Sequence, residues 1–107
     1  MKINRGDVVI GPDFIGGNNK RPFVVISNED HPFSSEECLA VLITTTERDQ
    51  AIPLPEEKFE KGELPKKSYA SPWTITTLKT SAVQEKIGKL NSETIKEISD
   101  QVTTYIK

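Results

Sequence analysis

The residue types with the clearest chemical potential are two adjacent basic side chains, Lys20 and Arg21, and a run of three hydroxyls, Thr44–Thr46. Arg21 opens an apolar stretch over residues 21–27, and the threonines close another over residues 38–46. If the two stretches are neighbouring strands, the guanidinium and the hydroxyls converge at one end of a sheet. A guanidinium offers two parallel N–H donors to phosphoryl oxygens, and a threonine adds a neutral hydrogen bond. The pattern therefore indicates a phosphate-binding site.

RNA is a phosphodiester that such a site can cleave with little further machinery. Its 2′-hydroxyl is the nucleophile, so the protein has to orient the phosphodiester, stabilise the pentavalent transition state and move two protons. Arg21 would carry the electrostatic part, and the arrangement requires no metal and no other cofactor. A surface arginine and ordinary strand threonines explain the same composition without any function.

Three other side chains have a structural and a functional interpretation. Cys38 is the only cysteine and His31 the only histidine, so together they cannot assemble a zinc site, and Cys38 is expected in the core. His31 precedes Pro32 in a predicted loop, where exposure or support of a turn is favoured over proton transfer. Trp73 either stacks an unpaired base or is a half-buried sheet aromatic, and the sequence leaves both open.

Composition excludes several classes of protein. The 107 residues suit one domain spanning 1–107, and they contain no apolar run of membrane-spanning length. A net charge of -2 lacks the broad basic field of general duplex-DNA binders. No P-loop, GxSxG or HExxH motif is present, and the N-terminus lacks the apolar core of a signal peptide. We expect a cytoplasmic protein that does not enter the membrane.

The remaining patterns predict short strands followed by one helix. Gly11, Pro12 and Asp13 should stop the first strand, and a capping Asn91 followed by apolar residues at spacings of three and four should start the helix. Without strand–helix alternation, five to seven short strands favour a mainly β fold, a small barrel or curled antiparallel sheet capped by the helix. The expected strands are residues 7–10, 21–27, 38–46, 51–54, 68–77 and 84–90, with a flexible Gly/Asn loop at 14–20 and a charged connector at 55–67.

The order of these motifs resembles the MazF/PemK toxins of type II toxin–antitoxin systems. The matching segments are RGDVV, a Gly/Asn loop leading into RPFVVIS, then AVLITTT, IPL, the WTI strand and a C-terminal helix, which together span almost the whole chain. The resemblance implies an SH3-like barrel, a homodimer, sequence-specific cleavage of single-stranded RNA such as mRNA, and inhibition by a small antitoxin whose tail occupies the RNA groove.

The resemblance also assigns roles to individual residues. The family's arginine before proline falls on Arg21 and its strand-end threonine on Thr44, which are the expected catalytic pair. Two acidic positions of the family hold other residues here, around Asn18 and Asn19 and at about Ala70, so the general acid and base are unidentified. The expected RNA contacts are Asn19, Lys20, Thr45, Ser71 and Trp73.

The missing acids keep two other functions open. One is a non-enzymatic toxin on the same fold, either a topoisomerase poison like the CcdB proteins or a diverged member that only binds its antitoxin. The other is a small barrel that binds nucleic acid without cutting it, which salt-dependent binding without new RNA ends would indicate.

Overall fold

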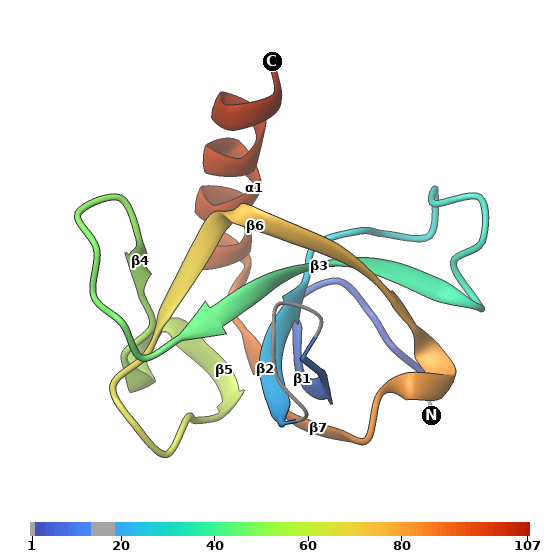
Figure 1. Cartoon of the computed structure of the whole chain (residues 1–107), viewed down its shortest axis with the longest axis horizontal. Helices are drawn as coiled ribbons and strands as arrows, with labels where there is room; N and C mark the ends of the chain where they lie inside the picture. Colours follow the sequence, from blue (N-terminus) through green and yellow to red (C-terminus); the bar gives the residue numbers. More distant parts are fainter. Residues whose placement is uncertain (1, 14–18) are drawn as a thin grey trace.

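The computed structural model describes residues 2–13 and 19–107. Within these residues the protein is mostly β, with seven antiparallel strands in a curled sheet and one C-terminal helix (Figure 1), which confirms the predicted fold class. The predicted loop at 14–20 lies largely outside the described residues. The elements are β1 (Asp7–Pro12), β2 (Lys20–Val25), β3 (Glu37–Thr44), β4 (Ile52–Pro53), β5 (Phe59–Gly62), β6 (Tyr69–Lys79), β7 (Glu85–Leu90) and α1 (Ser92–Ile106), with short 3₁₀ turns η1 (Glu56–Lys58) and η2 (Thr80–Ala82).

The sheet is buried on both faces because its central strands contribute alternate residues to two apolar cores. The strand order is β4-β6-β3-β2-β1-β7-β5, so β2 lies between β1 and β3 and meets the condition set for Arg21 and Thr44 to converge. Val24 points into the core covered by α1, and Phe23 points into the core closed by Val83 after η2. This two-sided burial explains the near-continuous apolar runs of β2 and β3 in the sequence.

The helix forms where its cap and apolar spacing predict. The Asn91 side chain accepts hydrogen bonds from the Thr94 N–H at 2.9 Å and the Thr94 hydroxyl at 2.7 Å. Ile95, Ile98 and Val102 are buried against the sheet. No helix in residues 2–13 or 19–107 has the length and apolarity that crossing a membrane requires.

Strand β6 changes its register on β3 partway along. Leu42 pairs with Ser71, whereas the preceding residue Val41 pairs with Ile75. The shift leaves residues 72–74 without partners on β3, and β6 bends at the side of α1 (Figure 1). The bulge presents Trp73 at the surface next to the helix.

Several predicted boundaries were wrong. Strands β2 and β3 end at Val25 and Thr44, each two residues earlier than predicted. The first strand does not stop at Gly11, because Gly11 and Pro12 continue the β1–β2 hairpin opposite Arg21 and Lys20. The connector at 55–67 contains η1 and the strand β5, which pairs with β7 despite its charged composition. The predicted edge strand at 51–54 is confirmed as β4, at one end of the sheet.

Candidate functional site

The end of the β1–β2 hairpin brings a carboxylate to the predicted arginine. Arg21 pairs with Gly11 across the hairpin, and the Asp13 N–H donates to the Asn19 carbonyl at 3.1 Å. The Asp13 Oδ2 atom lies 3.5 Å from the Arg21 Nη1 atom. The side chain of Asp13 is 9% exposed and that of Arg21 is 34% exposed. The carboxylate is thus held inside the site, while the guanidinium keeps a face open to a ligand.

The strand-end threonine lies across the sheet from this arginine. The β2–β3 ladder pairs Phe23 with Leu42, and the same register continued by two residues sets Arg21 opposite Thr44 on one face. The Thr44 Oγ1 atom accepts a hydrogen bond from the Thr46 N–H at 3.1 Å. Because that contact uses an acceptor lone pair, the Thr44 hydroxyl proton is available to a phosphoryl oxygen. The predicted convergence of guanidinium and hydroxyl is therefore consistent with the strand order.

The expected RNA contacts divide into exposed and buried residues. Asn19, Lys20 and Thr45 are exposed around the arginine and threonine. Ser71 is buried, 4% exposed, on β6 opposite Leu42, and a contact between Ser71 and RNA stays a prediction. Trp73 is 38% exposed and meets the Tyr105 ring edge-on at a centroid distance of 6.0 Å.

Asp13 is the residue that sequence reasoning missed. The family resemblance points to acids near Asn18 and Asn19 and at about Ala70, whereas the local pattern assigns Asp13 only to the end of the first strand. Asn18 lies outside the described residues, and Ala70 is fully buried between Ile43 and Ile52. The usable signal was the hairpin itself, because an antiparallel pair places the residue after β1 close to the start of β2.

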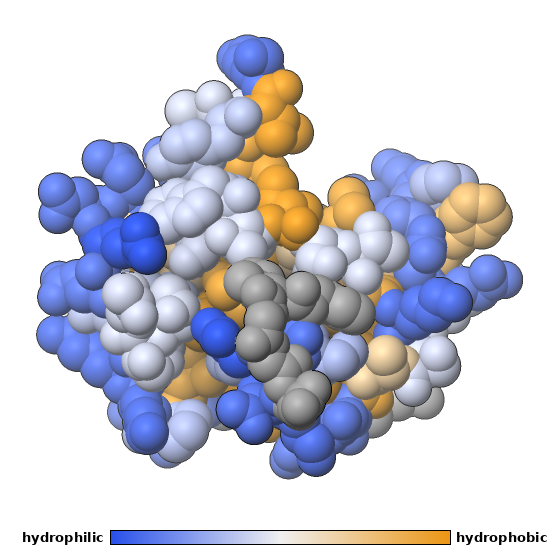
Figure 2. Space-filling model, in the orientation of Figure 1, coloured by the Kyte–Doolittle hydropathy of each residue, from blue (hydrophilic) through white to orange (hydrophobic). Residues whose placement is uncertain are grey.

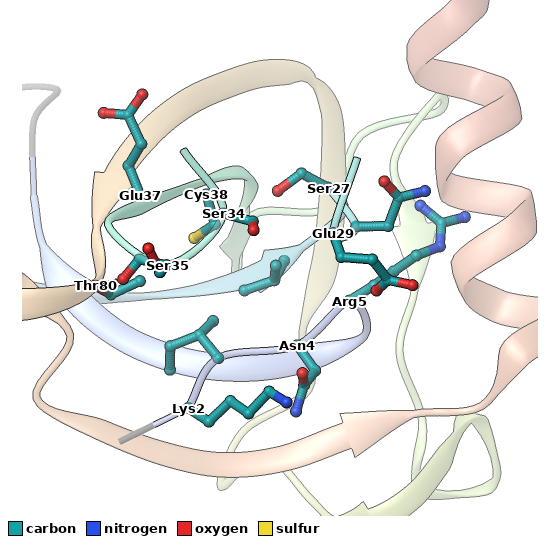
Figure 3. A pocket seen from close by; sticks show the side chains of 13 residues that line it. Lys2, Asn4, Arg5, Ser27, Glu29, Ser34, Ser35, Glu37, Cys38 and Thr80 are labelled. Carbon is teal, nitrogen blue, oxygen red and sulfur yellow. Dashed lines mark hydrogen bonds between the residues drawn. The ribbon is translucent and has the colours of Figure 1, made fainter. Parts of the chain in front are cut away.

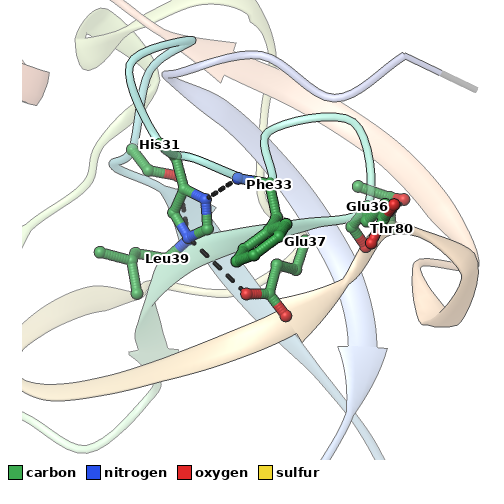
Figure 4. Close-up of polar contacts among 7 residues, drawn as sticks. His31, Phe33, Glu36, Glu37, Leu39 and Thr80 are labelled. Carbon is green, nitrogen blue, oxygen red and sulfur yellow. Dashed lines mark hydrogen bonds and ion pairs between the residues drawn. The ribbon is translucent and has the colours of Figure 1, made fainter.

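His31 supports a turn, as predicted. Its Nδ1 atom accepts a hydrogen bond from the Phe33 N–H at 3.0 Å, and its Nε2 atom lies 3.9 Å from Glu37 (Figure 4). Glu37 begins β3 and Thr44 ends it. Since a strand advances roughly 3.3 Å per residue, His31 is about 20 Å away from the threonine and serves no proton transfer there.

Cys38 lies in the core, also as predicted, beside a cavity at the start of β3. The cavity, about 810 Å³, is lined by Lys2, Arg5, Ser27, Glu29, Cys38 and Thr80 among others (Figure 3). Burial, reinforced by the carboxylates of Asp7 and Glu37, raises the pKa of the Cys38 thiol to about 11. The thiol is therefore protonated and a poor nucleophile near neutral pH. This cavity is at the start of β3, away from the Arg21 end of the sheet.

The structure is thus a small β protein whose curled sheet sets an arginine, a carboxylate and a hydroxyl at one end, a set of groups that could bind phosphate. The sequence matches the family described as PemK-like, MazF-like toxin of type II toxin–antitoxin system over residues 4–106, and the chain belongs to this family. No curated protein matches the sequence.

Solved structures share the fold. An endoribonuclease in complex with its cognate antitoxin from a mycobacterial species superposes with a TM-score of 0.76 at 20% identity, covering 98% of this chain and 93% of that one. The Mycobacterium tuberculosis toxin MazF-mt6 gives 0.72 at 17% identity, with coverages of 94% and 95%. MazE-MazF from Deinococcus radiodurans gives 0.78 at 14% identity, with coverages of 99% and 97%. At these identities the likeness concerns the fold alone.

Proposed function

We propose that this protein is the toxin of a toxin–antitoxin pair and acts in the cytoplasm as a metal-independent endoribonuclease that cleaves single-stranded RNA at specific sequences. Membership of the MazF-like toxin family supports the proposal. The observation that carries it is the Arg21–Asp13 pair, 3.5 Å apart, at the sheet end where β3 presents Thr44.

The three side chains divide the chemistry of a phosphodiester cleavage between them. Asp13 accepts the proton of the RNA 2′-hydroxyl as the 2′-oxygen attacks phosphorus. The bond from phosphorus to the 5′-oxygen breaks, and the leaving oxygen takes a proton from solvent water, which gives a 2′,3′-cyclic phosphate and a 5′-hydroxyl. Arg21 stabilises the charge of the pentavalent transition state, and the Thr44 hydroxyl orients a phosphoryl oxygen.

The pairing of Arg21 with Asp13 is compatible with both roles. A guanidinium has five N–H donors, and the contact with Asp13 is made by Nη1, so the other nitrogens can donate to phosphate. The Asp13 carboxylate lies 3.5 Å from that guanidinium, so one phosphodiester can meet both groups.

The test is incubation of the purified protein with single-stranded RNA in EDTA, followed by sequencing of the 5′ ends. We expect cleavage at a short recurring sequence, and a loss of about 10²–10³-fold in rate for Arg21→Ala. Intact RNA, or cleavage that Arg21→Ala leaves unchanged, would contradict the proposal. Growth arrest with intact RNA and trapped DNA breaks would instead indicate a topoisomerase poison.

We also propose that the toxin is a homodimer joined at an apolar surface around the end of α1. Trp73, Tyr105 and Ile106 are 38%, 42% and 70% exposed there, and Figure 2 shows apolar surface running along the helix. Exposed apolar patches of this kind mark interfaces. Ile106→Glu should convert the dimer to a monomer in light scattering. Phe33→Glu, which alters an exposed aromatic in the loop between β2 and β3, should leave the dimer intact. A wild-type monomer would refute the dimer.

The second partner of the proposed toxin is a cognate antitoxin that covers the Arg21 end of the sheet. The guanidinium at that end is open to a competing peptide, since Arg21 keeps a third of its side chain exposed. The product of a short reading frame beside the toxin gene should abolish RNA cleavage at equimolar ratio. Undiminished cleavage by the complex would place the antitoxin elsewhere.

A further inference from the structure

A small pocket lies next to the proposed catalytic end of the sheet, between β4 and the start of β6. It has a volume of about 300 Å³, at the lower end of the range of small-molecule sites, which is roughly 300–1,000 Å³. Its apolar wall is the run Pro53–Pro55, of which Leu54 is almost fully buried. Glu47, Lys67 and Tyr69 also line this pocket.

The pocket begins one strand away from the expected catalytic threonine. Tyr69 is the register partner of Thr44 on the β3–β6 ladder, so the two side chains lie on one face of the sheet. Glu47 follows Thr44 in the loop whose first turn is closed by the Thr46–Thr44 hydrogen bond. A nucleotide whose phosphate contacts Thr44 therefore has this pocket as a neighbour.

Three of the polar side chains that line the pocket form no polar contact within the described part of the chain, whereas the Ser68 hydroxyl donates to the Lys66 carbonyl at 2.8 Å. Neither Glu47 nor Lys67 forms an ion pair there, and the Tyr69 hydroxyl forms no hydrogen bond. Ser99 Oγ is the one described side-chain atom that is both buried and without a partner, so the Tyr69 hydroxyl reaches the surface although Tyr69 is only 4% exposed. Side chains that end in a carboxylate, an ammonium and a hydroxyl thus border a mostly apolar wall.

We propose that this pocket holds one unstacked nucleobase of the RNA strand, beside the phosphate that Arg21 and Thr44 bind. A nucleobase has two apolar faces and an edge of donors and acceptors, which matches a proline and leucine wall with a carboxylate and an ammonium at its rim. The inference rests on the proposed RNA-cleaving function, and it assigns part of the sequence specificity to Glu47, Lys67 and Tyr69.

The test compares two neighbouring lysines. Lys67 lines the pocket, whereas Lys66, which is also exposed, does not. With a randomised RNA library, Lys67→Gln should lower the base preference at one position beside the cut by about tenfold, the effect of one lost base contact. Lys66→Gln should leave the preference at every position unchanged, and Glu47→Gln should relax the same position as Lys67→Gln. Preferences unchanged in both Lys67→Gln and Glu47→Gln, with active enzyme, would overturn the pocket assignment.

A binding measurement separates failure of this inference from failure of the proposed activity. Uncleavable 2′-O-methyl RNA oligonucleotides that differ at one base can be titrated against the ¹⁵N-labelled protein. We expect base-dependent shifts of the Leu54 and Tyr69 amide signals, even if the wild type cuts no RNA. Absence of those shifts with all four bases would overturn the pocket assignment. If the shifts appear but the wild type does not cut unmodified RNA, only the catalytic proposal is overturned.

Discussion

Removing the carboxylate beside the arginine tests the division of roles in the site most informatively. Asp13→Asn keeps the shape of the side chain and removes its charge. Because a third of the Arg21 side chain is exposed, the pair should contribute no more than about 1 kcal/mol to folding. For a domain of this size such a loss lowers Tm by roughly 4–8 °C at most. As the proton acceptor, however, Asp13 should contribute roughly 10²–10⁴-fold to the cleavage rate.

The two contributions differ enough for one set of assays to separate them. Single-turnover cleavage of a short RNA and thermal unfolding are measured for Asp13→Asn, Arg21→Ala and the double variant. The control is Asp30→Asn, which removes an exposed acid near the other end of β3. Residues that act as a unit are strongly non-additive, so the double variant should be about as slow as the slower single variant. An Asp13→Asn protein that cleaves at the wild-type rate, or one that loses activity only through unfolding, would refute this role.

Three further predictions concern residues around the site and in the fold. Thr44→Val should slow cleavage roughly tenfold while Thr44→Ser retains most activity, since the hydroxyl is the relevant group; equal rates for both would contradict this. Because the pKa of the Cys38 thiol is raised to about 11 in the folded protein, the unfolded chain loses this proton at lower pH. The free energy of unfolding should therefore fall by up to roughly 2 kcal/mol between about pH 9 and pH 11. The same plot of unfolding free energy against pH for Cys38→Ser should lack that decline. Gly62→Ala should lower the free energy of unfolding by more than about 2 kcal/mol, because Gly62 has φ +73° and a Cβ there would lie 2.3 Å from the Ile87 carbonyl oxygen. The measurement is urea unfolding, with Gly11→Ala as the matched control because a Cβ at Gly11 has its nearest contact at 3.5 Å.

Local signals predicted much of the fold. The apolar runs of β2 and β3 and the Asn91 cap of α1 depend only on residues close together in the sequence. Each of these elements is found where the sequence predicts it, to within two residues. Strand β5 was not predicted because its charged composition is typical of a solvated loop. It is fixed by a distant contact, the close approach of Gly62 to Gly88 on β7, which no local pattern reveals.

The site was predictable only in part for the same reason. Arg21 and Thr44 follow from their positions at strand ends, given the strand order. Asp13 depends on the β1–β2 register, and the exposure of Trp73 depends on the bulge in β6. Both are consequences of pairing between segments that are separated in the chain.

The most direct measurement of the central claim uses a substrate that lacks the nucleophile at one position. An RNA carrying the preferred cleavage sequence is compared with the same RNA in which the nucleotide before the cut is 2′-deoxy, both in EDTA. We expect the all-RNA strand to yield a 2′,3′-cyclic phosphate and a 5′-hydroxyl, and the 2′-deoxy strand to stay intact. Cleavage of the 2′-deoxy strand at the same bond, or products with a 5′-phosphate, would contradict attack by the 2′-hydroxyl.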